Sequence, residues 1–131
     1  MIGLDTNVLV RYVTLDDPMQ ARAAVRLIDS LTAEEPGFIP VVVLAELAWV
    51  LEVSYDFNKA AMARVFEALL RSKELVVEQK ETALQALGLF AAGNADFADY
   101  LIERCGNAVG CTRTVTFDQR AAKSAGMQFL R

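Results

Sequence analysis

Histidine is absent from this chain of 131 residues. Its absence removes the commonest general base of enzymes and the commonest ligand of transition metals. Ser-His-Asp triads, Cys-His pairs and HExxH zinc sites are therefore excluded. The side chains left for catalysis are carboxylates, lysine, tyrosine, serine and threonine. A metal held by their oxygen atoms would be Mg²⁺ or Mn²⁺ rather than zinc.

Cysteine is scarce. The two cysteines, Cys105 and Cys111, fall in different predicted elements and match neither a zinc-binding spacing nor a CxxC motif. We interpret them as two buried or half-buried thiols.

Long hydrophobic runs and targeting segments are missing as well. The longest apolar stretch, residues 38–51, is interrupted by Glu46 and is too short to span a bilayer. No basic segment precedes an apolar core at the N-terminus, as it would in a signal peptide. We therefore expect a cytoplasmic protein with no membrane partner.

The composition indicates one domain with an apolar surface to spare. The length suits a single compact domain. The chain is 54% hydrophobic with a mean hydropathy of +0.29, which favours both a sizeable core and an apolar interface. With 17 acidic and 13 basic residues, the net charge is −4, which argues weakly against broad electrostatic binding of nucleic acid.

Short strands and helices alternate along the whole chain. Strands are predicted at residues 2–4, 38–40, 75–77, 108–112 and 127–130. Helices are predicted at residues 7–13, 19–31, 41–53, 58–71, 81–92, 96–104 and 118–125. This alternation predicts an α/β fold with a short, mainly parallel sheet of four to five strands, covered by helices on both faces.

Carboxylates stand at positions that should be apolar or structurally special. Asp5 follows the first strand, where it is either a helix N-cap or part of a site. Glu46 lies within an apolar helix, where an ionised side chain is costly unless it is paired or bound to a metal. Asp96 and Asp99 open a later helix, and Asp118 follows the segment 115–117. Capping explains Asp96 and Asp118 individually, and either a pairing with arginine or a helix edge that reaches solvent would explain Glu46.

Taken together, these carboxylates predict a cation site. Like charges packed closely repel one another, so a hard divalent cation would be needed to hold them together. Such an ion can activate a hydroxide and stabilise an in-line phosphoryl transition state. A phosphodiesterase without histidine would have this pattern.

The chain resembles the PIN domain family and, within it, the VapC-type ribonuclease toxins of toxin–antitoxin pairs. Four segments carry the resemblance, in order: IGLDTNVL at 2–9, VVVLAEL at 41–47, ADFADYLI at 95–102 and VTFD at 115–118. Each segment alone is a weak signal, but the ordered set is fairly specific. The resemblance implies a single PIN-like domain over residues 1–131, built as a three-layer α/β/α sandwich.

The resemblance also implies an activity: a metal-dependent endoribonuclease that cuts single-stranded or loop regions of tRNA or another structured RNA. Asp5, Glu46 and Asp99 would bind Mg²⁺ or Mn²⁺, with Asp118 completing the cluster directly or through water. The supporting residues would be Thr6, Asn7 and Thr116, which orient the carboxylates or the substrate phosphate, with Asp96 as the reserve ligand on its helix. A homodimer and a cognate antitoxin protein are the implied partners.

One departure and one set of arginines fall outside that assignment. After Asp99 the family commonly continues with small residues, whereas this chain has Glu103 and Arg104, to which no family role transfers. Arg11, Arg113 and Arg120 lie close in sequence to the acidic segments. They could contact phosphate, although an ordinary surface role suits each one better.

Other functions remain open at this level. Flap-type nucleases and haloacid-dehalogenase-like phosphatases also place carboxylates at strand ends, although the latter would need an early Asp-x-Asp pair and here Asp5 is followed by Thr6 and Asn7. A non-catalytic PIN-like interaction domain would not need the complete set of acidic positions. A plain α/β binding module leaves Glu46 unexplained.

Overall fold

All five strands of the protein are parallel to their partners. The structure, a computed structural model, describes residues 1–131 and divides into two compact units, Met1–Lys80 (unit 1) and Glu81–Arg131 (unit 2). Unit 1 contains β1 (Ile2–Gly3), α1 (Thr6–Thr14), α2 (Pro18–Ser30), β2 (Gly37–Ile39), α3 (Val41–Tyr55), α4 (Lys59–Arg71) and β3 (Leu75–Val77). Unit 2 contains most of α5 (Lys80–Ala92), then α6 (Phe97–Ala108), β4 (Val115–Thr116), α7 (Gln119–Ser124) and β5 (Gln128–Phe129).

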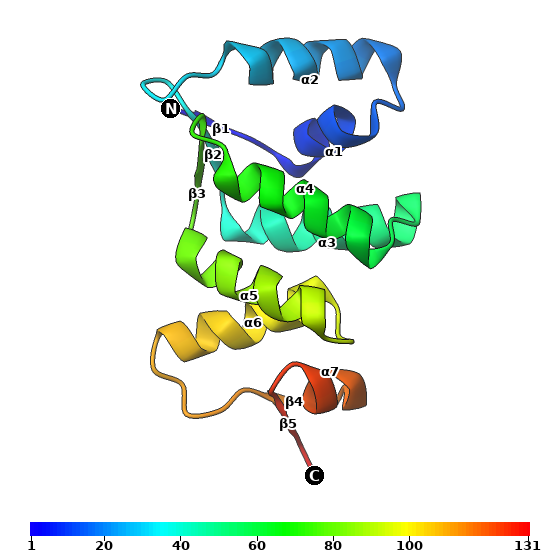
Figure 1. The fold of residues 1–131 in the computed structure, drawn as a ribbon, viewed down its shortest axis with the longest axis vertical. Coiled ribbons are helices and arrows are strands. Elements are labelled where there is room, and N and C mark those ends of the chain that lie inside the picture. The colour runs from blue at the N-terminus through cyan, green and yellow to red at the C-terminus, as the bar shows by residue number, and fades with distance from the viewer. The chain divides into compact units, whose positions relative to one another are not determined.

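The sheet of unit 1 has the strand order β1-β2-β3. Parallel neighbours need long crossovers, and two helices supply each of them: α1 and α2 between β1 and β2, and α3 and α4 between β2 and β3 (Figure 1). Gly37 pairs with both Ile2 and Leu75. A Cβ at Gly37 would lie 2.9 Å from side-chain atoms of Leu31 and Leu4, so only glycine fits there without a shift.

The core of unit 1 comes from apolar side chains at helical spacing. In α3, Leu44, Leu47 and Leu51 are fully buried, and Leu9 of α1 and Ile39 of β2 are too. Burial of each such side chain stabilises the fold by roughly 1.5–3 kcal/mol. The core therefore fixes the start of α1 and one face of α3, the two elements that carry the first two acidic motifs.

Unit 2 is built around an aromatic cluster. The rings of Phe90 and Phe97 meet edge to face with centroids 5.8 Å apart, and Phe90 meets Tyr100 at 6.4 Å. The hydroxyl of Tyr100 accepts a hydrogen bond from the backbone N–H of Ala95 at 3.3 Å. It occupies the space that a Cβ at Gly93 would need. This packing fixes the first turn of α6, where the third acidic motif lies.

The predicted fold class is confirmed, since the chain is mixed α/β with seven helices and parallel strands. The helices at 58–71 and 81–92 and the strand at 75–77 lie at or within one residue of their predicted positions. The strands pair as a three-stranded sheet and a separate two-stranded sheet of β4 and β5. A single domain over residues 1–131 stays a prediction.

The predicted strand at 108–112 is wrong. Helix α6 continues to Ala108, and the chain then turns at Gly110, whose φ of +93° favours glycine. Val109 is 81% exposed, so its apolar side chain has no core to pack against. The strand that pairs with β5 is Val115–Thr116 instead. The first strand also differs from its predicted range of 2–4, because it ends at Gly3. Ile2 within the strand is exposed, and Leu4 after the strand is buried.

None of the seven helices is both long enough and apolar enough to cross a membrane.

Candidate active site

Asp5 lies between β1 and α1 and acts as the N-cap of the helix. Its backbone is extended, with φ −80° and ψ 159°, and its Oδ1 accepts a hydrogen bond from the N–H of Thr6 at 2.7 Å. This contact satisfies one of the unpaired N–H groups at the helix start. The side chain is exposed, and Oδ2 has no protein partner. Asp5 therefore caps a helix and still offers an oxygen atom for a ligand.

Glu46 shares a pocket with Asp5 but is not buried. The two side chains line one open cavity of about 480 Å³ together with Thr6, Asn7 and Arg11. Along α3, Glu46 lies on an exposed face with Val42, 68% exposed, and Trp49, 62% exposed. The expectation that Glu46 stands at a costly position within an apolar helix is therefore wrong, because its helix edge reaches solvent. The residues of α3 are apolar on both faces, and composition alone cannot tell which face meets solvent. The shared pocket, not a cost of burial, is what marks Glu46.

Thr6 lines the same pocket and has a buried hydroxyl without a partner. The residue is 5% exposed, and its Oγ1 is the one buried side-chain polar atom without a hydrogen-bond partner. Buried polar atoms are nearly always hydrogen-bonded, so such an atom calls for an explanation such as a bound ligand, ion or water. Asp5 and Glu46 supply carboxylate oxygen atoms to the pocket, and oxygen is the donor atom that Mg²⁺ and Mn²⁺ prefer.

The only arginine that lines this pocket, Arg11, is held by other partners. Its Nε donates to Gln20 at 2.7 Å, and its Nη1 donates to the Tyr55 hydroxyl at 3.1 Å and to Asp16 Oδ1 at 3.3 Å. The Tyr55 hydroxyl also donates to Asp16 Oδ2 at 2.6 Å. That hydrogen bond is the largest cause of a lowered pKa at Asp16, with smaller contributions from Thr14 and Arg11. Asp5 and Glu46 form no ion pair.

In unit 2, three motif carboxylates surround the start of α6 and α7. Asp99 Oδ2 accepts a hydrogen bond from the Asp96 N–H at 3.2 Å, as in a capping box. Asp118 caps α7, since its Oδ1 accepts from the N–H groups of Arg120 at 2.8 Å and Ala121 at 3.0 Å. Asp96 and Asp118 therefore lie at the N-cap positions of α6 and α7, the positions at which capping was predicted for them.

Thr116 and Arg120 organise this group. Thr116 Oγ1 accepts a hydrogen bond from the Asp118 N–H at 2.9 Å, which orients the turn that carries Asp118. Arg120 Nη2 donates to Asp96 Oδ1 at 2.7 Å in an ion pair. Asp96 is therefore already paired with a cation, whereas Asp99 has no ion-pair partner in the chain.

Asp99 is the motif carboxylate whose pKa is raised by its surroundings. Burial raises the pKa of Asp99, and the like charges of Asp96 and Asp118 raise it further. The hydrogen bond with the Asp96 backbone and the charge of Arg120 act in the opposite direction. A half-buried carboxyl beside two like charges is a common setting for a functional acid. This favours Asp99 over Asp96, and its assignment as a ligand stays a prediction.

Two features were missed from the sequence. The Arg11–Asp16–Tyr55 network joins residues 44 positions apart, and no local pattern in the sequence indicates such a pairing. The ion pair of Arg120 with Asp96 spans 24 positions. Glu103 and Arg104, which departed from the family pattern, pair with each other at 2.7 and 3.1 Å.

The structure brings Asp5 and Glu46 together in unit 1 and Asp96, Asp99 and Asp118 together in unit 2. Within neither unit do three or more carboxylates or thiols cluster closely enough to hold a metal ion.

Comparisons with known proteins agree with this arrangement of motifs. A family model for the PIN domain matches residues 2–126. The chain is also similar to the VapC ribonuclease of Aquifex aeolicus (strain VF5), with 26% identity over 121 residues, which are 92% of this chain and 89% of that protein. The match includes all four acidic segments, and the chain belongs to the PIN domain family.

Proposed function

We propose that this protein is a metal-dependent endoribonuclease and the toxin of a toxin–antitoxin pair. The observation that carries the proposal is the pocket of unit 1, which is lined by Asp5 from the N-cap of α1, by Glu46 from α3 and by Thr6, whose buried hydroxyl has no hydrogen-bond partner. Membership of the PIN domain family and the similarity to a VapC ribonuclease support it.

The proposed ligands of the metal are Asp5, Glu46 and Asp99, with Asp118 as the fourth carboxylate. Their oxygen atoms suit Mg²⁺ or Mn²⁺, and the chain has no histidine to favour zinc. The bound ion would activate a water molecule and stabilise negative charge on the phosphate.

The chain's own residues hold this site ready. The cap bond of Asp5 with the Thr6 N–H fixes the Asp5 carboxylate at the start of α1. Thr116 fixes the turn of Asp118 in the same way. Asn7 lines the pocket of unit 1, where its amide can orient a carboxylate or the substrate phosphate. Asp96, paired with Arg120, is assigned a supporting role.

The proposed partners are an RNA such as tRNA or another structured RNA, a cognate antitoxin and a second copy of the chain. Exposed apolar side chains support an interface: Val42, Trp49 and Val53 are at least 60% exposed and lie seven and four residues apart on α3. The proposed place of action is the cytoplasm. Size-exclusion chromatography with light scattering tests the homodimer.

The decisive experiment is RNA cleavage by the purified chain, free of any partner protein. A structured RNA is incubated with Mg²⁺, with Mn²⁺ or with EDTA. We expect cleavage with either ion, none with EDTA, and a loss of about 100-fold or more in Asp5→Asn and Glu46→Gln. Asp29→Asn and Glu34→Gln are the matched controls, because both side chains are exposed in unit 1 and lie outside the Asp5–Glu46 pocket.

Each result decides between named functions. Cleavage that survives in both Asp5→Asn and Glu46→Gln contradicts the proposal. Binding of RNA without cleavage under any metal condition favours a non-catalytic interaction domain. Hydrolysis of phosphomonoesters but not of RNA favours another carboxylate-dependent phosphoryl-transfer enzyme.

A further inference from the structure

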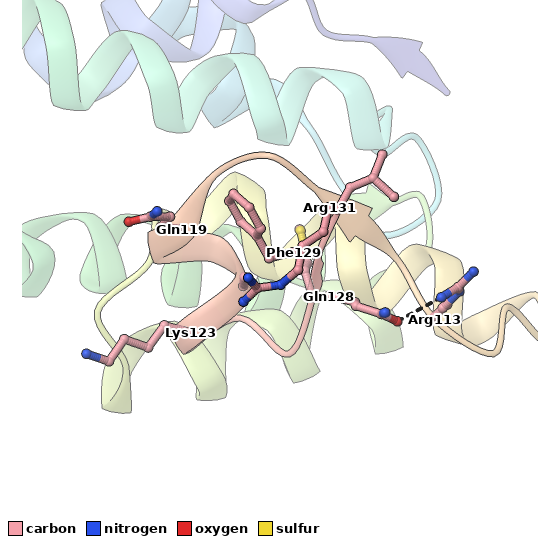
Figure 2. A pocket seen from close by; sticks show the side chains of 9 residues that line it. Arg113, Gln119, Lys123, Gln128, Phe129 and Arg131 are labelled. Carbon is pink, nitrogen blue, oxygen red and sulfur yellow. Dashed lines mark hydrogen bonds between the residues drawn. The ribbon is translucent and has the colours of Figure 1, made fainter.

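Unit 2 contains a second cavity, which we name the basic pocket. It has a volume of about 830 Å³, and its lining includes Arg113, Gln119, Lys123, Gln128, Phe129 and Arg131. No carboxylate side chain is among the lining residues. Figure 2 shows Lys123 and Gln119 extending from one side and Arg113 on the other, beside Gln128. Volumes in this range are typical of ligand-binding clefts.

The positive charge of this pocket is not neutralised within the chain. Arg113, Lys123 and Arg131 form no ion pair, whereas Arg11, Arg71, Arg104 and Arg120 each pair with a carboxylate. Arg113 Nη1 donates to Gln128 Oε1 at 3.0 Å, so its guanidinium group is held by a neutral amide that leaves its charge intact. In a chain of net charge −4, a gathering of unpaired cations attracts an anionic ligand.

An aromatic surface accompanies the charge. The guanidinium carbon of Arg131 lies 5.7 Å from the centroid of the Phe129 ring. Phe117 packs edge to face against Phe129 at 6.5 Å and is 75% exposed. Exposed rings beside arginine and lysine are the usual means of holding an unpaired nucleotide, because bases stack on the rings while phosphates meet the cations.

The sequence joins this pocket to the proposed site. Phe117 immediately precedes Asp118 and Gln119 immediately follows it. Gln119 and Lys123, four residues apart on α7, line the pocket, and Asp118 caps that helix. A ligand bound in the basic pocket therefore contacts Gln119, the neighbour in sequence of Asp118, which is one of the carboxylates assigned to the reaction.

We infer that the basic pocket binds a single-stranded stretch of the RNA substrate next to the bond that is cut. The inference rests on the proposed function and adds the place in the fold where the RNA strand is bound. Phosphates contact Arg113 and Lys123, and an unpaired base stacks on Phe117. An acidic peptide would satisfy the cations but would leave the aromatic pair without a use.

Binding of a fluorescein-labelled 12-nucleotide RNA of unpaired sequence, followed by anisotropy in EDTA, tests this inference without cleavage. We expect the double variant Arg113→Gln, Lys123→Gln to bind about 10-fold more weakly. Its slope of log affinity against log salt should fall by about 1.4, because two phosphate contacts are lost. Phe117→Ala should weaken binding by about 5-fold or more. The matched controls are Arg64→Gln with Lys73→Gln, and Val109→Ala, all at exposed positions outside the pocket.

The outcomes separate this inference from the proposed function. Equal RNA affinity and salt slope in the wild type and the double variant overturn the inference, and so does an equal loss in the control double variant. A double variant that keeps RNA but loses a fluorescent poly-glutamate peptide also overturns it and assigns the pocket to an acidic protein. If the wild type binds RNA through this pocket but never cleaves it with Mg²⁺ or Mn²⁺, the proposed function fails and the inference stands. If cleavage needs Asp5 and Glu46 but has the same KM in the wild type and the double variant, the proposed function stands and the inference about the basic pocket fails.

Discussion

The acidic groups of the two units differ in whether an arginine forms an ion pair with one of their carboxylates. In unit 2, Arg120 forms an ion pair with Asp96, and its charge also opposes the raised pKa of Asp99. In unit 1, Arg11 lines the pocket of Asp5 and Glu46 but pairs with Asp16 instead. The acidic group of unit 2 therefore includes a paired arginine. In unit 1, the arginine of the pocket forms its ion pair with a carboxylate outside the pocket.

This difference indicates where a ligand is needed most. Asp5 and Glu46 have no ion-pair partner, and the hydroxyl of Thr6 beside them has no hydrogen bond. Two carboxylates that share a pocket without a paired cation favour the binding of a cation there. The group in unit 2 is partly neutralised before any ligand binds, which leaves Asp99 as its one half-buried carboxylate without an ion pair.

The largest expected effect separates Asp99 from Asp96. Asp99→Asn should lower the rate of metal-dependent RNA cleavage by about 100-fold or more, because it removes a proposed ligand. Asp96→Asn should lower it by only about 10-fold, which is typical of a residue that supports a ligand. Single-turnover cleavage with a range of Mg²⁺ concentrations measures both. A greater loss in Asp96→Asn would reverse the assignment and break the comparison.

Thermal melting controls for unfolding in that experiment. Because burial raises the pKa of Asp99, its ionised form is disfavoured by folding, and the stability it contributes is present at low pH and lost as the pH rises through the raised pKa. The neutral amide avoids this loss. Asp99→Asn should therefore melt no lower than the wild type at pH 7, with any advantage gone below the ordinary aspartate pKa of about 3.9. A clear drop in melting temperature at pH 7 would contradict this.

The sequence predicted local features better than pairings between distant residues. Asn58 as a cap followed by a helix to Arg71, and Asp5 before α1, follow from short-range rules and match the structure. The exposed face of α3 was only one of the explanations open for Glu46, because Val42 and Trp49 are as apolar as the buried Leu47 and do not mark which face meets solvent. The partners of Asp16 and Asp96 were also out of reach, since each depends on how separate elements pack.

A smaller effect is expected from the unpaired hydroxyl of unit 1. Thr6→Val keeps the shape of the side chain and removes the buried oxygen, so the metal-free protein should gain about 1 kcal/mol in free energy of unfolding. Thr14→Val is the matched control on the same helix. Its hydroxyl donates to Val10 at 2.8 Å, so it should lose about 1 kcal/mol. Urea unfolding measures both, and a loss of stability in Thr6→Val would mean that the hydroxyl already has a partner.

The smallest expected effect tests the network in which Asp16 accepts a hydrogen bond from Tyr55 and pairs with Arg11. Tyr55→Phe removes the hydrogen bond that contributes most to the lowered pKa of Asp16. A lowered pKa in the folded state contributes stability above the ordinary aspartate pKa of about 3.9, and this stability is lost as the pH falls through the lowered value. Tyr55→Phe should therefore melt slightly below the wild type at pH 7, and the two curves should converge as the pH falls below the lowered pKa of Asp16. Tyr12→Phe, which removes a hydroxyl elsewhere in unit 1, should show no such pH dependence. Identical melting of Tyr55→Phe and the wild type at every pH would mean that the hydrogen bond of Tyr55 with Asp16 contributes no stability to this network.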